Sequence, residues 1–189
     1  YVQSLVNTVS SMNDSYTIHF DRLKRFLAIE PNLFQIILKT IVEKNKKDGT
    51  RLQVWMDFFS EHFDQLGDDI ELIKKAYIQQ DKIHNHFDFE GKGMLNILKK
   101  DSNFLIEYIN SLYDAKHFGI SGDHKRLEFV WKVEGIENVL TNVFDLVFEK
   151  EPYLGIGDHF CNAFFRNLQA EQKEKASKFL LNYARTNFN

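Results

Sequence analysis

The chain has 189 residues, of which 43% are hydrophobic and 27% charged, and its formal net charge is -3. This composition is typical of globular proteins, and no apolar run approaches the roughly 18 residues that a membrane-spanning helix needs. Because 24 basic and 27 acidic residues are interspersed, the charge pattern argues against a nucleic-acid partner. The single cysteine, Cys161, excludes an internal disulfide and indicates a cytoplasmic protein.

The apolar residues follow helical spacing along almost the whole chain, and 2 Pro and 9 Gly are too few for the turns of a β domain. We therefore predict an all-α protein of about ten helices. In chain order they span roughly 1–11, 16–28, 31–46, 50–66, 69–84, 92–100, 102–116, 125–134, 136–150, 158–168 and 171–187. Pro31 sets the first turn of the third helix, and glycines at 49 and 67 end the third and fourth.

The chain also repeats itself. The apolar stripe of the predicted helix 31–46 returns about 71 residues later in the helix 102–116, and a third match begins at Lys175. The matched residues are Leu33, Phe34, Ile37, Leu38 and Ile41 in the first copy; Phe104, Leu105, Tyr108, Ile109 and Leu112 in the second; and Phe179, Leu180 and Tyr183 in the third. Self-similarity at a fixed period is typical of stacked helical arrays.

We therefore predict one domain over 1–189, built as a right-handed αα-solenoid of the HEAT or TPR kind. Its units are 16–88, 89–157 and an incomplete unit at 158–189. Because the last unit stops early and the chain lacks an initiating Met, we expect it to be part of a longer protein. An apolar end without its neighbour predicts weak self-association through the C-terminal end.

Two pairs of motifs resemble the C-terminal helical region of large bacterial STAND-type NTPases, which are multidomain proteins implicated in defence against phage. They are the helix starts Asn32-Leu33-Phe34 and Ser102-Asn103-Phe104-Leu105, followed by Arg51-Leu52…Trp55 and Arg126-Leu127…Trp131. The resemblance implies a sensor or scaffold segment, with the nucleotide site in another part of the protein. It carries over no catalytic residue, because none of that family's phosphate-binding motifs lies here.

One cluster could support enzyme chemistry. His84, His86 and Asp88, with Asp81 upstream, are residue types that bind zinc or a harder transition metal. Ligands two positions apart suit an extended loop, and this segment lies where a helix gives way to one. The alternative is a polar helix end, where histidine is favourable against the helix dipole. We favour the polar end and expect neither a metal nor another cofactor.

Aromatic residues make up 14% of the chain, and most of them have the spacing of a helical core. The exceptions fall in predicted loops and are candidates for contact with a protein partner. These are Phe87, Phe89, Phe118 and Tyr153. We therefore predict a non-catalytic helical-repeat scaffold or sensor module for protein recognition or intramolecular regulation. An α-helical metal-dependent enzyme that uses His84, His86 and Asp88 is the alternative.

Overall fold

The computed structural model describes residues 4, 25, 28–29, 32–48, 69–83, 88, 90–113, 125–150 and 162–187. Within these residues the chain forms helices and turns and no strand, which confirms the all-α class. The chain divides into two compact units, Tyr1–Phe87 and Asp88–Asn189.

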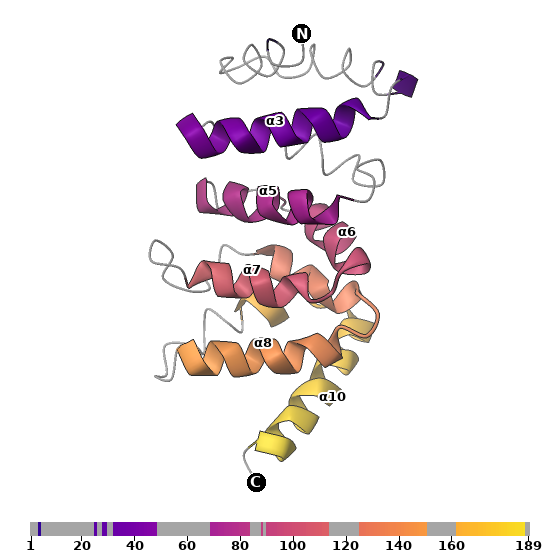
Figure 1. Ribbon diagram of the computed structural model, residues 1–189. Coiled ribbons are helices and arrows are strands. Elements are labelled where there is room, and N and C mark those ends of the chain that lie inside the picture. The colour runs from indigo at the N-terminus through magenta and orange to yellow at the C-terminus, as the bar shows by residue number, and fades with distance from the viewer. Residues whose placement is uncertain are drawn as a thin grey trace. The chain divides into compact units, whose positions relative to one another are not determined.

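In the first unit, α3 (Leu33–Asp48) and α5 (Ile70–Ile83) lie side by side (Figure 1). The N-terminus of α5 is capped by Asp69, whose Oδ1 accepts a hydrogen bond from the backbone N–H of Leu72 at 3.1 Å. Each helix turns a set of apolar side chains inward. The buried ones are Ile37 and Leu38 on α3 and Ile73, Ala76 and Tyr77 on α5.

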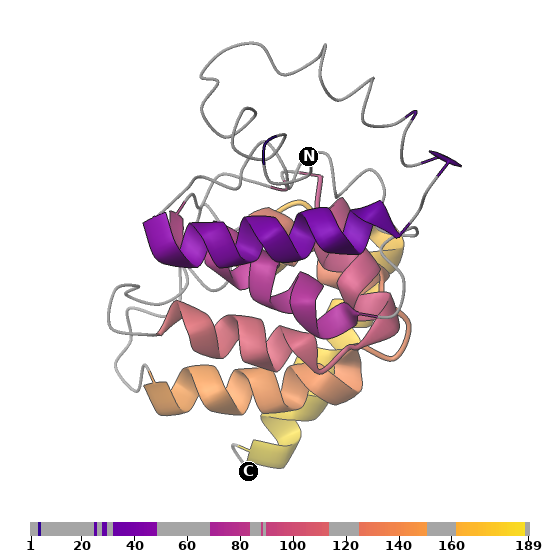
Figure 2. The same cartoon turned by 45° about the horizontal axis from the view of Figure 1, so that its top comes forward.

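The second unit contains six helical segments within the described residues. They are α6 (Lys92–Lys100), α7 (Phe104–Leu112), the 3-10 helix η2 (Lys125–Lys132), α8 (Glu137–Lys150), a helical turn at 162–165 and α10 (Ala170–Asn187). Figures 1 and 2 show α7 and α8 side by side and running in the same direction, and η2, which connects them along the chain, packs against α6 and α10. The axis of α10 is inclined to both.

The described residues hold eight helical segments, and each lies where the sequence predicted a helix. This number is below the predicted total of about ten. Of the predicted helices at 1–11 and 16–28 only residues 4, 25 and 28 are described, each of them helical, and the predicted helix at 50–66 falls outside the described residues. The solenoid arrangement stays a prediction.

The apolar stripe of the second repeat forms the centre of the core. Phe104, Leu105, Tyr108 and Ile109 are each 0% exposed, as the sequence predicted. In addition, α7 begins at Phe104 and α3 begins at Leu33, which are matching positions in the repeat. The side chains of Phe34 and Ile41 lie outside the described residues.

The third sequence match has a different local structure. Lys100 ends α6 and Phe104 starts α7 after a turn, whereas the matching residues lie inside the continuous helix α10. Phe179 is buried like its counterpart Phe104, but Leu180 is 39% exposed although its counterpart Leu105 is fully buried. The similarity of sequence therefore does not extend to secondary structure at this pair of segments.

The sequence predicts an α-helix over 125–134, but the structure has a 3-10 helix over Lys125–Lys132. Among its buried residues, Leu127 and Val130 are three positions apart, as are Glu128 and Trp131, which fits the period of a 3-10 helix. The backbone N–H of Val133 donates to the Val130 carbonyl at 2.9 Å, in the i to i-3 pattern. A short apolar spacing of three fits both helix types, so the sequence could not distinguish them.

Glycine is required at the start of α6. Gly91 has a left-handed backbone with φ 64°, and a Cβ added to it would lie 2.9 Å from Cβ and 2.7 Å from Cγ of Phe129. These atoms form the base of the Phe129 side chain and cannot swing away. Gly135 has a similar φ of 70°, but a Cβ there would meet only Asn138 Nδ2 at 3.9 Å.

Comparing alanine substitutions at these two glycines distinguishes the cost of backbone strain from the cost of steric overlap. We expect Gly135→Ala to cost about 1–2 kcal/mol, the cost of a left-handed residue with a side chain. Gly91→Ala should cost a further 1–3 kcal/mol or so because of overpacking against Phe129. Urea denaturation of both variants measures the difference. Equal losses would show that the approach to Phe129 does not constrain this turn.

Truncating a side chain of the buried stripe on α7 should strongly lower the free energy of unfolding. We expect Phe104→Ala to lower the free energy of unfolding by about 3–5 kcal/mol, because a fully buried ring leaves a cavity. Phe148→Ala serves as the matched control, since Phe148 is 41% exposed and has less contact to lose. Thermal and urea unfolding measure both variants, and a similar loss for the two would contradict the assignment of Phe104 to the core.

Candidate binding groove between α8 and α10

Most of the site residues predicted from the sequence lie outside the described residues. This applies to the histidines of the candidate metal cluster and to all four candidate partner contacts, namely His84, His86, Phe87, Phe89, Phe118 and Tyr153. Of the candidate metal ligands, Asp81 and Asp88 are described. Asp81 is buried, with an exposed fraction of 2%.

Asp88 caps the N-terminus of α6. Its Oδ1 accepts a hydrogen bond from the N–H of Gly93 at 3.0 Å, and its Oδ2 accepts one from the N–H of Met94 at 2.9 Å. Its backbone carbonyl accepts the N–H of Gly91 at 2.9 Å, which closes the turn. Both carboxylate oxygens thus satisfy helix N–H groups that would otherwise lack partners.

The same geometry explains the glycine-containing segment at 90–93. The sequence predicts a turn between helices here rather than a phosphate-binding loop, and the structure confirms the turn. The N–H groups of Gly93 and Met94, which could have faced an anion, face Asp88. In the described part of the chain no three His, Cys, Asp or Glu residues are grouped as a metal site would require.

An aromatic cluster connects η2 and α8 to residues 162–187, which we call the C-terminal segment. Trp131 on η2 lies 5.7 Å from the ring of Phe165 and 5.9 Å from that of Phe179, measured between centroids. Phe144 on α8 meets Phe179 edge-on at 5.0 Å and Tyr183 at 5.3 Å. Edge-to-face packing of this kind is favourable between aromatic rings. Because the rings stand between the helices, they keep α10 at a distance from α8.

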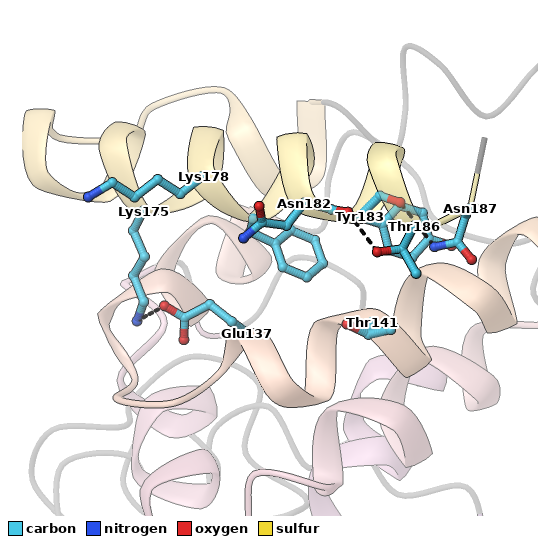
Figure 3. A pocket seen from close by; sticks show the side chains of 9 residues that line it. Glu137, Thr141, Lys175, Lys178, Asn182, Tyr183, Thr186 and Asn187 are labelled. Atoms are coloured by element: carbon cyan, nitrogen blue, oxygen red, sulfur yellow. Dashed lines mark hydrogen bonds and ion pairs between the residues drawn. The ribbon is translucent and has the colours of Figure 1, made fainter. Parts of the chain in front are cut away.

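A groove with a volume of about 400 Å³ opens beside this cluster, between α8 and α10 (Figure 3). It is lined by two residues of α8 and seven of α10: Glu137, Thr141, Lys175, Lys178, Phe179, Asn182, Tyr183, Thr186 and Asn187. Its volume lies within the range of roughly 300–1,000 Å³ that is typical of ligand sites. Its lining is unusually polar for such a site.

Lys175 joins the two walls at one end of the groove. Figure 3 shows its side chain reaching from α10 to Glu137 on α8, where Nζ and Oε1 are 3.3 Å apart. The same Nζ donates to the backbone carbonyl of Val133 at 2.8 Å and lies 3.4 Å from that of Trp131. These carbonyls are at the C-terminal end of η2, where a cation is favourable. Lys175 is therefore a structural clamp.

Other polar side chains of the groove are also engaged. Lys178 forms an ion pair with Glu174 at 2.7 Å, and both residues are largely exposed. Tyr183 donates its hydroxyl to Asp145 at 2.6 Å, and Asn187 donates to the Tyr183 carbonyl at 3.1 Å. The pKa of Tyr183 is raised by burial first, and then by the hydrogen bond to Asp145 and by its charge.

Asn182 and Thr141 differ from the groove residues described above in the engagement of their side chains. Both line the groove and both are exposed, one from each wall. Within the described part of the chain, the side chain of neither residue takes part in a hydrogen bond. The groove thus has aromatic support, a clamped end, an unengaged amide on the α10 wall and an unengaged hydroxyl on the α8 wall.

The groove was not predicted from the sequence. A signal was present in α10, where the polar residues Lys175, Lys178, Asn182 and Thr186 recur at helical spacing beside the apolar face. The opposite wall could not be predicted, because Glu137 and Thr141 are about forty positions away in the sequence.

No family model matches the chain, and it matches no curated protein and no solved structure. In the described part of the chain, no helix has the length and apolar character that crossing a membrane requires. The geometry of the groove is therefore the basis for assigning a function.

The raised pKa of Tyr183 predicts how stability depends on pH. We expect Tyr183→Phe to lower the free energy of unfolding by about 1 kcal/mol near pH 7, through loss of the bond to Asp145. The pKa is higher in the folded state than the roughly 10 of an unfolded tyrosine. The contribution is therefore complete below pH 10 or so and is lost as the pH rises through the folded-state pKa.

Urea titrations of both proteins between pH 7 and pH 11 measure this. The difference in stability between wild type and Tyr183→Phe should be constant up to about pH 10 and shrink above it. A difference that stays constant through pH 11 would show that Tyr183 is not held in its neutral form by the fold.

Proposed function

We propose that this chain is a non-catalytic recognition module that binds an extended polypeptide segment in the groove between α8 and α10. The observation that carries the proposal is the unengaged carboxamide of Asn182 facing the groove. A carboxamide offers one acceptor oxygen and a donor NH2 group, the same pair that a peptide backbone presents in reverse. A single asparagine can therefore pair with a peptide group independently of the partner's side chains.

The walls of the groove support this role because they are rigid before any partner arrives. Rings of Phe144, Phe179 and Tyr183 pack at right angles or in stacks along the boundary between the helices. The Lys175–Glu137 pair closes one end. A preformed groove lowers the entropy cost of binding, since its side chains are already ordered. Thr141, on the opposite wall, supplies a second hydrogen-bonding group.

We further propose that the module belongs to a larger cytosolic protein and that its helices stack as an αα-solenoid. The parallel course of α7 and α8, which η2 connects along the chain, is the relation expected of successive helix pairs in such a stack. The resemblance to the C-terminal region of STAND-type NTPases favours a sensor or scaffold role. The bound segment would then come from another protein or from another part of the same one.

The test is selection from a displayed library of random peptides, followed by fluorescence anisotropy with the selected peptides. We expect Asn182→Ala to weaken binding about tenfold, since two hydrogen bonds together are worth about 1.4 kcal/mol or somewhat more. Asn142→Ala is the matched control, because Asn142 is an exposed asparagine on α8 that does not line the groove.

Two outcomes would contradict the proposal. One is a selection that yields no peptide binding more tightly than about 1 mM, which is the weak end of specific recognition. The other is a set of peptides that bind wild type, Asn182→Ala and Asn142→Ala equally well. Circular dichroism of both variants confirms that the helices are retained.

A further inference from the structure

The α8 wall of the groove continues beyond Thr141 to an exposed carboxylate. Asp145 lies one turn after Thr141, and at about 100° per residue their side chains leave α8 only about 40° apart. The hydroxyl of Tyr183, which lines the groove from α10, donates to Oδ1 of Asp145 at 2.6 Å. This bond holds the carboxylate at the end of the groove opposite the Lys175–Glu137 pair (Figure 3).

An aromatic ring borders the same carboxylate. Phe148 follows Asp145 by three positions, so the two side chains are neighbours on the surface of α8. The ring of Phe148 stacks on that of Tyr183, with the centroids 6.2 Å apart and the planes inclined by 13°, and Phe148 is 41% exposed. Tyr183 thus contacts both residues. We call Asp145, Phe148 and Tyr183 the acidic end of the groove.

The charge of Asp145 is not neutralised by the cations near it. Within the described residues, no lysine or arginine forms an ion pair with Asp145, and its Oδ2 takes part in no hydrogen bond. Lys150 leaves α8 about 140° from Asp145, and Arg185 leaves α10 about 160° from Tyr183, so both point away from this end. The two lysines that line the groove are each paired with a glutamate.

We propose that the acidic end of the groove binds an arginine side chain of the polypeptide segment that lies in the groove. This inference rests on the proposed function and adds a residue type that the segment carries. A guanidinium group can donate to Oδ2 of Asp145 and stack its plane on the exposed ring of Phe148. A lysine ammonium can pair with the carboxylate but has no plane to stack, so arginine is favoured.

The spacing along α8 gives the arginine a fixed place in the segment. Thr141 and Asp145 are four positions apart, which is about 6 Å along the helix axis. An extended chain covers this distance in about two residues, at roughly 3.3 Å each. A segment that contacts Thr141 and Asn182 therefore reaches the acidic end without a bend, and its arginine should occupy one position relative to the peptide group that Asn182 binds.

Parallel selection tests the residue type. The displayed library of random peptides is selected on wild type and on Asp145→Asn, which removes the charge but keeps an acceptor for the Tyr183 hydroxyl. We expect peptides from wild type to align with arginine at one position, and peptides from Asp145→Asn to lack this preference. Peptides that depend on Asn182 but show no arginine preference would overturn this inference and leave the proposed function intact. A selection without binders would contradict both.

Fluorescence anisotropy with a selected peptide measures the contact itself. We expect Asp145→Asn to weaken binding about threefold to fivefold, as for an exposed ion pair. Glu171→Gln is the matched control, because it removes an exposed carboxylate of α10 that does not line the groove, and it should bind like wild type. Circular dichroism of both variants checks that the helices are retained.

Peptide variants complete a double-mutant cycle. Replacing the arginine of the peptide by alanine should weaken binding to wild type about tenfold and should remove the effect of Asp145→Asn. Replacing it by lysine should cost about threefold on wild type and nothing on Phe148→Leu, which lacks the ring. An equal effect of Asp145→Asn on the arginine and alanine peptides would overturn the proposal, because the carboxylate would then act only through Tyr183. A lysine peptide that binds wild type as tightly as the arginine peptide would overturn the choice of arginine.

Discussion

The packing of Trp131 is the interaction on which the second unit depends. Its side chain is 2% exposed, and its indole N–H donates to the backbone carbonyl of Phe164 at 2.8 Å, 33 positions further along the chain. An indole buried this deeply needs such a partner, because an unsatisfied buried donor costs about 1–3 kcal/mol. The ring also contacts Phe165 and Phe179. One side chain on η2 thereby positions the whole C-terminal segment.

Polar contacts around η2 add to the stabilisation that the aromatic packing provides. Asn167 donates from Nδ2 to both carboxylate oxygens of Glu128, at 2.9 and 3.0 Å. Arg126, which is 1% exposed, donates from Nε to the hydroxyl of Tyr108 at 2.7 Å. Lys175 closes the C-terminal end of η2. A 3-10 helix of eight residues is longer than usual, and these contacts explain how it persists.

Helix α10 has two faces with different chemistry. On one face, Tyr183 meets Phe144 of α8, and these bulky rings hold the two helices apart and leave a polar groove. The other carries exposed leucines among charged residues. A hydrogen-bonding groove favours recognition of an extended backbone, whereas an apolar helix face favours another helix.

The sequence by itself determined which segments are helical and which of their faces are apolar. The spacing of Phe104, Leu105 and Tyr108 predicted both a helix and a buried stripe, because that pattern is set by residues within two turns of one another. The same local reasoning indicated a turn in the segment 90–93, where α6 begins. It could not show that Asp88, a candidate metal ligand by residue type, caps that helix with both of its oxygens.

Only the tertiary structure decided which neighbour covers each apolar face. Leu105 and Leu180 match in sequence, yet the first is fully buried and the second is 39% exposed. Likewise, Asn182 and Thr141 belong to helices far apart in sequence and line one groove. The physical reason is that periodicity specifies the direction of a side chain relative to its own helix. Its burial depends on distant residues such as Trp131 and Phe164, whose pairing no local pattern encodes.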